Sequence, residues 1–85
     1  MHIKSNLIYL RNKNNLPKRT LARLSNVNHA VIHLIETGKT SEQKITIDTV
    51  SKLASFFQVT IDDFIYKDLS QNNDVSPNDT ERNNL

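Results

Sequence analysis

Two histidines, His29 and His33, lie four residues apart in a chain of 85 residues. On an α-helix this spacing places both imidazoles on one face. An imidazole can donate a hydrogen bond to N7 or O6 of a purine or to a phosphate, and it can also bind a metal ion. The segment between the two lacks the glutamate found in zinc-peptidase helices, and no third metal ligand is evident. We therefore expect no metal or other cofactor at this pair, which leaves contact with nucleic acid and a plain solvated surface as the two interpretations.

The sequence lacks the residue types and spacings that common catalytic sites need. The chain has no cysteine that could serve as a nucleophile or thiolate ligand, and its single glycine, Gly38, rules out a glycine-rich phosphate loop. Asp62 and Asp63 are neighbours on a predicted helix, so their side chains point about 100° apart and make a poor acid and base pair. We expect no catalytic residues and no enzymatic activity.

The chain carries no sign of a membrane or secretory segment. Its apolar stretches, such as Leu7–Leu10, are far shorter than the roughly 18 to 20 residues that cross a bilayer. One small domain accounts for the 85 residues, which leaves no effector domain for a small-molecule ligand. We expect a cytoplasmic protein.

The scarcity of glycine and proline and the spacing of apolar residues predict an all-α fold with five helices. The first helix places Ile3, Leu7 and Leu10 on one face and ends in the turn at Asn14 and Asn15. The residues expected to point outward from this helix are Lys4, Asn6, Arg11 and Lys13.

Two short helices follow, from Pro17 to Leu24 and from His29 to Thr37. Pro17 suits the first turn of a helix, Asn28 suits an N-cap, and Gly38 suits a left-handed residue after a helix end. The apolar residues of these helices and of the turn between them are Leu21, Ala22, Leu24, Val27, Ile32 and Ile35.

Two further helices complete the predicted domain, each beginning after a threonine cap, Thr46 or Thr60. Asp63 follows Thr60 by three residues, as in a capping box. Residues 67–85 are rich in Ser, Asn, Asp and Gln, so we expect a folded domain over 1–66 and a disordered tail over 67–85. The apolar positions of the two helices are Ile47, Val50, Leu53, Ala54, Phe57, Ile61, Phe64, Ile65 and Tyr66.

Charge is distributed unevenly along the chain. Residues 1–46 hold eight Lys and Arg residues and two acids, hence +6, whereas residues 47–85 hold three and seven, hence −4. The formal net charge of +2 therefore hides a basic first half that would face a polyanion.

The order of these features resembles the phage repressor and Cro family of helix-turn-helix regulators, also called the xenobiotic-response-element family. The resemblance covers about residues 3–66, with the helix-turn-helix at about 17–37. It implies a lambda-repressor-like domain that binds double-stranded DNA, usually as a dimer on a two-fold operator, with the helix at 29–37 in the major groove. The matching segments are Leu7–Arg11, Leu16, Leu21-Ala22, Val27, Ile32, Ile35–Lys39, Ile47–Val50, Leu53-Ala54 and Val59–Phe64.

The resemblance also implies roles for individual positions. Arg11 and Glu36 match an ion pair that joins the first helix to the end of the third. The base-reading positions are occupied here by His29, Ala30, His33 and Leu34. The positions that touch phosphate are occupied by Lys18, Asn28, Thr37, Lys39 and Thr40, and the nearby cations Arg19 and Lys44 extend this basic surface.

Three departures separate the chain from the family pattern. Pro17-Lys18 stands where the family usually has Thr-Gln, so the side-chain cap and the glutamine that braces the recognition helix are both absent. Asn26 replaces the usual turn glycine, although Asn tolerates a left-handed conformation. The loop after Gly38 is about three residues longer than the common form.

Some apolar residues near the end of the predicted domain cannot be buried in helices this short. Phe56, Ile61, Ile65 and Tyr66 cannot all face inward, and an exposed apolar patch often marks an interface. We expect a homodimer through these residues, and the alternative is that the tail folds back over them.

The sequence thus predicts a small transcriptional regulator, a repressor or autoregulator, that binds a specific duplex DNA sequence. The alternative is a protein-interaction module with the same fold, such as an antitoxin-like or regulator-tethering subunit.

Overall fold

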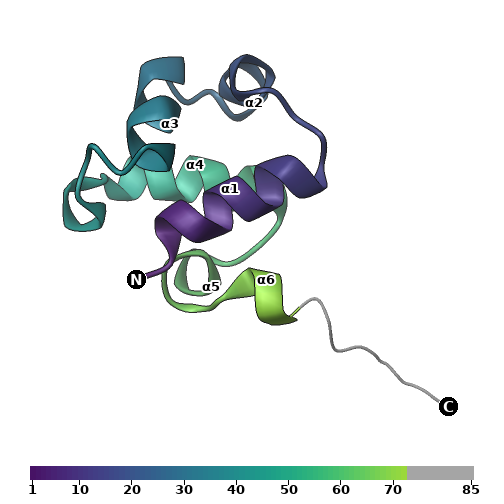
Figure 1. The fold of residues 1–85 in the computed structure, drawn as a ribbon, viewed down its shortest axis with the longest axis vertical. Helices are drawn as coiled ribbons and strands as arrows, with labels where there is room; N and C mark the ends of the chain where they lie inside the picture. The colour runs from purple at the N-terminus through teal and green to yellow at the C-terminus, as the bar shows by residue number, and fades with distance from the viewer. Residues whose placement is uncertain (73–85) are drawn as a thin grey trace, which may run out of the picture.

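The protein is all-α over the residues that its computed structural model describes, which are 1–72; the predicted tail residues 73–85 lie outside them. This confirms the predicted fold class, with one helix more than the five expected. Figure 1 shows α1 and α4 crossing in the middle, α2 and α3 on one side of them, and α5 and α6 on the other. The helices are α1 (Ile3–Lys13), α2 (Lys18–Ser25), α3 (His29–Glu36), α4 (Ile47–Phe57), α5 (Ile61–Tyr66) and α6 (Leu69–Asn72), with a 3-10 helix η1 (Glu42–Lys44).

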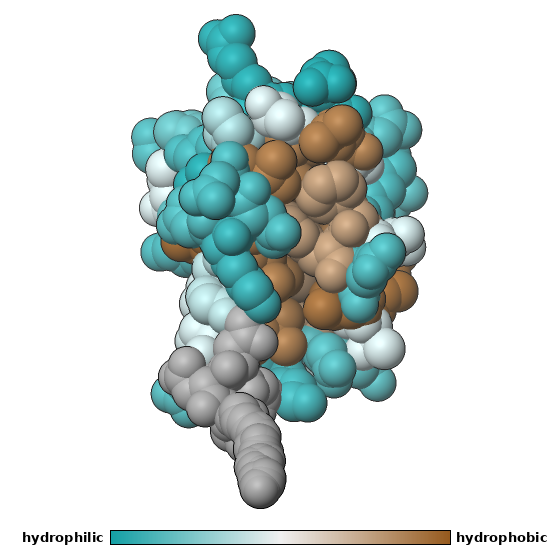
Figure 2. Space-filling view, turned by 90° about the vertical axis from the view of Figure 1, so that its right-hand side faces the viewer, coloured by the Kyte–Doolittle hydropathy of each residue, from teal (hydrophilic) through white to brown (hydrophobic). Residues whose placement is uncertain are grey.

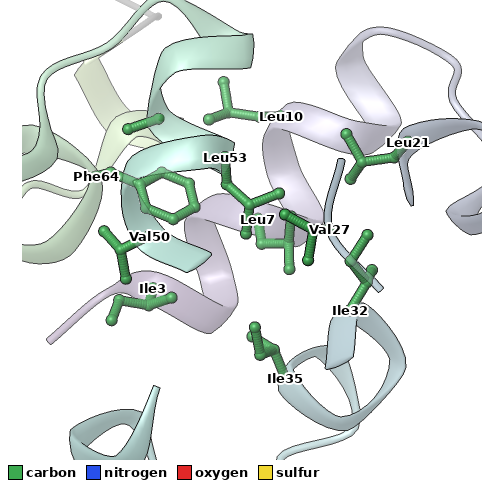
Figure 3. Packing of buried hydrophobic residues seen from close by; sticks show 11 residues of the cluster. Ile3, Leu7, Leu10, Leu21, Val27, Ile32, Ile35, Val50, Leu53 and Phe64 are labelled. Atoms are coloured by element: carbon green, nitrogen blue, oxygen red, sulfur yellow. The ribbon is translucent and has the colours of Figure 1, made fainter. Parts of the chain in front are cut away.

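A single apolar cluster fills the space between these helices. Leu7 of α1, Leu53 of α4 and Val27 of the α2–α3 turn meet near its centre, as Figure 3 shows. Burying an aliphatic side chain of this size contributes about 1.5 to 3 kcal/mol, so the cluster is the main source of stability in a chain without disulfides. Its members are Ile3, Leu7, Leu10, Leu21, Val27, Ile32, Ile35, Val50, Leu53, Ala54 and Phe64.

Two apolar residues expected on buried helix faces are exposed instead. Ile47 is the first residue of α4 and is 65% exposed, whereas Val50 is buried. Leu24 is 48% exposed because the buried stripe of α2 runs through Leu21 and Ser25, with Leu24 beside it.

The predicted caps form at the starts of three helices. Asn28 Oδ1 accepts from Ala30 N at 2.7 Å, and Thr46 Oγ1 accepts from Thr49 N at 3.2 Å. Thr60 Oγ1 accepts from Asp63 N at 3.0 Å, which is the first half of the expected capping box. A cap of this kind contributes about 1 kcal/mol, and it fixes where each short helix begins.

Asn6 corrects the expected outward face of α1, because its side chain is fully buried. Its amide nitrogen donates to the carbonyls of Phe64 at 2.8 Å and Lys67 at 2.7 Å. Its amide oxygen accepts from Leu69 N at 3.0 Å. The buried amide of Asn6 is tolerated because all three of its hydrogen bonds are made to backbone groups around α5 and α6.

The helix α6 lies in the segment that composition indicated as tail. Asp68 precedes it and accepts from Ser70 Oγ at 2.7 Å and from Ser70 N at 3.2 Å. The hydrogen bond from the Ser70 hydroxyl is the main cause that lowers the pKa of Asp68. Leu69 then packs against the core and donates its N–H to Asn6, so the ordered part of the described chain continues beyond Tyr66.

Arg11 also departs from the expected outward face, because it forms an ion pair beneath α3. Its Nε and Nη2 donate to the two carboxylate oxygens of Glu36 at 2.6 and 2.8 Å, and its Nη1 donates to Leu16 O at 2.8 Å. Side-chain exposure is 16% for Arg11 and 5% for Glu36. The hydrogen bonds to Glu36 raise the pKa of Arg11 despite partial burial, so the pair that the family resemblance implied is present and holds α3 against α1.

We predict that Asn6→Ala lowers the free energy of unfolding by about 2 to 4 kcal/mol, because it leaves a buried carbonyl and two partly buried groups without their partner. Urea denaturation of the full chain measures this. Asn12→Ala is the control, since Asn12 is exposed on the same helix. A loss no larger than that of Asn12→Ala would show that the Asn6 hydrogen bonds contribute nothing.

We predict that Glu36→Gln lowers the free energy of unfolding by about 2 to 4 kcal/mol, because it leaves a partly buried guanidinium without its counter-charge. The double variant Arg11→Met with Glu36→Leu should recover part of this loss, since an apolar pair removes both buried charges.

The control for Glu36→Gln is Asp48→Asn, which breaks the exposed Asp48–Lys52 pair, whose side chains are 74% and 38% accessible. We expect a change within about 0.5 kcal/mol there. Equal losses in the two variants would contradict the structural role of the Arg11–Glu36 pair.

Candidate nucleic-acid interface

The helix α3 has one buried side and one exposed side. Ile32 and Ile35 are 0% and 1% exposed and fix the helix in the core. The residues expected to read bases, His29, Ala30, His33 and Leu34, are all exposed. The structure therefore gathers all four on the outward side of one helix, as their spacing predicted.

The turn between α2 and α3 sets how the two helices meet. Val27 is buried in the turn and donates its N–H to Ala22 O at 3.2 Å. Asn26 adopts the left-handed conformation, with φ of 61°, that a glycine usually supplies. The small side chain of Ala22 lets α2 pack closely beside α3.

Hydrogen bonds close both ends of α3. Asn28 Oδ1 is used as the N-cap, so only its amide nitrogen remains to donate to a phosphate. At the other end, Lys39 N donates to Leu34 O at 3.0 Å and Gly38 N donates to Ile35 O at 3.1 Å. Gly38 has φ of 75°, so the predicted left-handed ending of the helix is confirmed.

One cation of α2 contacts the outward side of α3 directly. Lys18 Nζ lies 3.2 Å from His33 Nδ1. On the other side of the same turn of α3, the Thr37 hydroxyl donates to His33 O at 2.8 Å. Lys18 stands at the position where the family usually has a glutamine, and here its side chain contacts α3.

The other predicted phosphate contacts precede and follow α3 in the sequence. Arg19 is exposed at the start of α2, and Lys39 is exposed directly after α3. Thr40 and Lys44 line a small cavity of about 180 Å³ together with Leu34. The longer loop therefore brings Lys44 back beside the end of α3.

A hydrogen bond that sequence analysis missed joins this loop to α1. Glu42 of η1 accepts from Lys4 N at 3.1 Å, which joins the loop to the first turn of α1. α1 has no side-chain cap and no acidic residue in its first turn, so a distant carboxylate supplies the negative charge that a helix start favours. The only feature of the sequence that indicates such a contact is the lack of a capping residue at the start of α1, and this does not identify Glu42 as the partner.

A second missed residue is Lys4, whose ammonium group lies near the end of α3. Its Nζ is 3.1 Å from the position that a Cβ atom would take at Gly38. The two residues are 34 positions apart in the sequence, so no local pattern indicates their proximity. Lys4 adds a cation to the edge of the basic surface around α3.

The residues expected at a dimer interface are only partly accessible. Ile61 and Tyr66 are 37% and 66% exposed, whereas Phe56 and Ile65 are half-buried. The ring of Phe56 packs edge-on against Phe57 with 5.0 Å between ring centroids. Figure 2 shows that one side of the molecule carries an apolar strip between hydrophilic margins.

Among the described residues, no group of three or more His, Cys, Asp or Glu side chains is placed to hold a metal ion. Within residues 1–72, no helix is long and apolar enough to span a bilayer.

Comparison with known proteins agrees with this arrangement. A family model described as helix-turn-helix matches residues 7–64, which run from α1 to α5 and include α2, the turn and α3. The chain has no significant match among curated proteins or among solved structures. Because the match covers more than half of the chain, the protein belongs to the helix-turn-helix family of the phage repressor and Cro type, a family of DNA-binding regulators.

Proposed function

We propose that the protein regulates transcription by binding a specific sequence of duplex DNA with α3 in the major groove. The observation that carries this is the division of α3 into a buried side, Ile32 and Ile35, and an exposed side that includes His29 and His33. A helix held in this way can enter a groove about 12 Å wide while its core contacts stay intact. Histidine can donate there to N7 or O6 of a purine.

The charge around α3 supports contact with the phosphate backbone. Lys18 and Arg19 precede the turn, Lys39 follows α3, and Lys44 returns beside it. The acids on α3 and in the loop are engaged inward, because Glu36 binds Arg11 and Glu42 binds the backbone of α1. Phosphate contacts from these cations would set the position of α3 on the duplex, and the exposed side chains of α3 would specify the sequence.

We further propose a homodimer that binds a two-fold operator. The exposed apolar residues Ile61 and Tyr66 of α5, with Phe56 at the end of α4, are the surface proposed for this contact. In a two-fold dimer the same patch serves both copies, and the two α3 helices then face successive turns of the major groove. Repression or autoregulation would follow from occupying such a site, as is usual in this family.

We predict that selection from random duplex DNA enriches a two-fold sequence with half-sites about one helical turn apart. In the enriched operator, His33→Ala should lose about 1 to 3 kcal/mol of discrimination at one base pair per half-site, because it removes a base contact. The readout is the affinity for each base substitution at fixed salt.

His2→Ala is the control for His33→Ala, since His2 lies before α1 and its backbone N–H donates to Ile65 O of α5. We expect no change in base preference there. If the native chain enriches no sequence, the protein-interaction alternative is favoured. If it enriches a sequence and His33→Ala leaves the base preference unchanged, His33 does not contact a base.

We predict that the full chain sediments as a dimer at micromolar concentration and that Ile61→Lys with Tyr66→Lys yields a folded monomer, because two ammonium groups cannot be buried unpaired in an apolar contact. Ile47→Lys is the control, since Ile47 is 65% exposed at the opposite end of α4 from Phe56. A native monomer, or a dimer that persists in the double variant, would contradict this interface.

A further inference from the structure

The contact between Lys18 and His33 is compatible with only one neutral tautomer of the His33 ring. The Lys18 ammonium group has three N–H donors and no acceptor. Its Nζ lies 3.2 Å from His33 Nδ1, so a hydrogen bond between them requires Nδ1 to be the acceptor. A neutral imidazole that accepts at Nδ1 carries its proton on Nε2.

No acid on α3 competes for this imidazole. Glu36 is the only acidic residue of α3, and both of its oxygens accept from Arg11. The Asn28 side-chain oxygen, at the start of α3, accepts from Ala30 N. Lys18 Nζ is therefore the side-chain group in hydrogen-bond contact with the His33 ring.

The accessible polar groups of Lys18 and His33 are hydrogen-bond donors. His33 is exposed, so its Nε2–H is free to meet a base edge, and the Lys18 ammonium keeps two N–H groups after it donates to Nδ1. In the major groove, guanine presents two adjacent acceptors, N7 and O6, whereas cytosine presents the N4 donor. Adenine offers one acceptor beside a donor, and thymine offers one acceptor beside a methyl group.

We infer that Lys18 is a positioning and specificity-determining residue, which holds His33 in the Nε2–H tautomer so that the pair recognises guanine and rejects cytosine. This rests on the proposed function, because it assigns a base preference to the same helix. It also gives Lys18 a part in sequence recognition that a phosphate contact alone does not have.

The test compares Lys18→Arg, which retains donors only, with Lys18→Glu, which offers acceptors only. Long-range proton–nitrogen NMR spectra of the free full chain at pH 8 report which nitrogen of His33 is protonated. We expect Nε2–H in the native chain and in Lys18→Arg, and Nδ1–H in Lys18→Glu, because a carboxylate accepts from Nδ1. A native chain with the proton on Nδ1 would overturn the inference.

The second readout is base preference in the enriched operator. Inverting the guanine–cytosine pair at the His33 position should weaken binding about tenfold in the native chain and in Lys18→Arg. Replacing that guanine by 7-deazaguanine should weaken binding of the native chain as well, because N7 is lost. In Lys18→Glu the preference for guanine should disappear or reverse.

Arg19→Glu is the matched control, since Arg19 is the next residue, is exposed, and undergoes the same reversal of charge. It should weaken binding to all sequences without changing the preference for guanine, because phosphate contacts carry no base information. An equal loss of preference in Arg19→Glu would show that Lys18 acts only through its charge, and that would overturn the inference.

The outcomes also separate this inference from the proposed function. An enriched operator that has no guanine at the His33 position, or a preference unchanged in Lys18→Glu, overturns the tautomer inference alone. If the native chain enriches no sequence, the proposed function fails, and the base preference fails with it.

Discussion

The guanidinium group of Arg11 is the contact on which the placement of α3 depends. One side chain joins three segments, because it donates to Glu36 at the end of α3 and to Leu16 O in the α1–α2 connection while it belongs to α1. α3 itself has two buried residues, Ile32 and Ile35, with Val31 partly buried against the core, and apolar contacts are not directional. A bidentate ion pair is directional, so it supplies the constraint that packing lacks.

The parts of the fold that local chemistry determines could be predicted from the sequence. Apolar spacing gave the positions of α1 to α5, and the caps at Asn28, Thr46 and Thr60 gave three helix starts, because a cap and its helix are neighbours in the chain. The exposed side of α3 followed in the same way, since burying Ile32 and Ile35 leaves His29 and His33 outside. The Arg11–Glu36 pair came from the family resemblance rather than from spacing.

The parts that depend on distant partners could not be predicted. Asn6 lies at the spacing of the buried residues of α1, but a polar side chain on that face is informative only when its partners, 58 to 63 residues away, are known. The bond between Glu42 and the start of α1 spans 38 residues. The contact between Lys18 and His33 depends on the conformations of two exposed side chains, which no sequence pattern specifies. α6 was missed because its short, polar segment holds one apolar residue, Leu69, and is stabilised by the distant side chain of Asn6 as well as by the packing of Leu69.

Because the partners of the Asn6 amide lie near the end of the described chain, α1 becomes fully stable only late in synthesis. A ribosome releases α1 first and the acceptor and donor groups around α6 much later, so a nascent chain carries Asn6 on its apolar face without partners until Leu69 has emerged. Closing a loop of about 60 residues also carries an entropic cost that rises with loop length. A chain that stops before Leu69 therefore contains all of α3 and yet lacks the last hydrogen bond that supports α1, so the helix that would contact DNA is complete before the domain that holds it is fully stabilised.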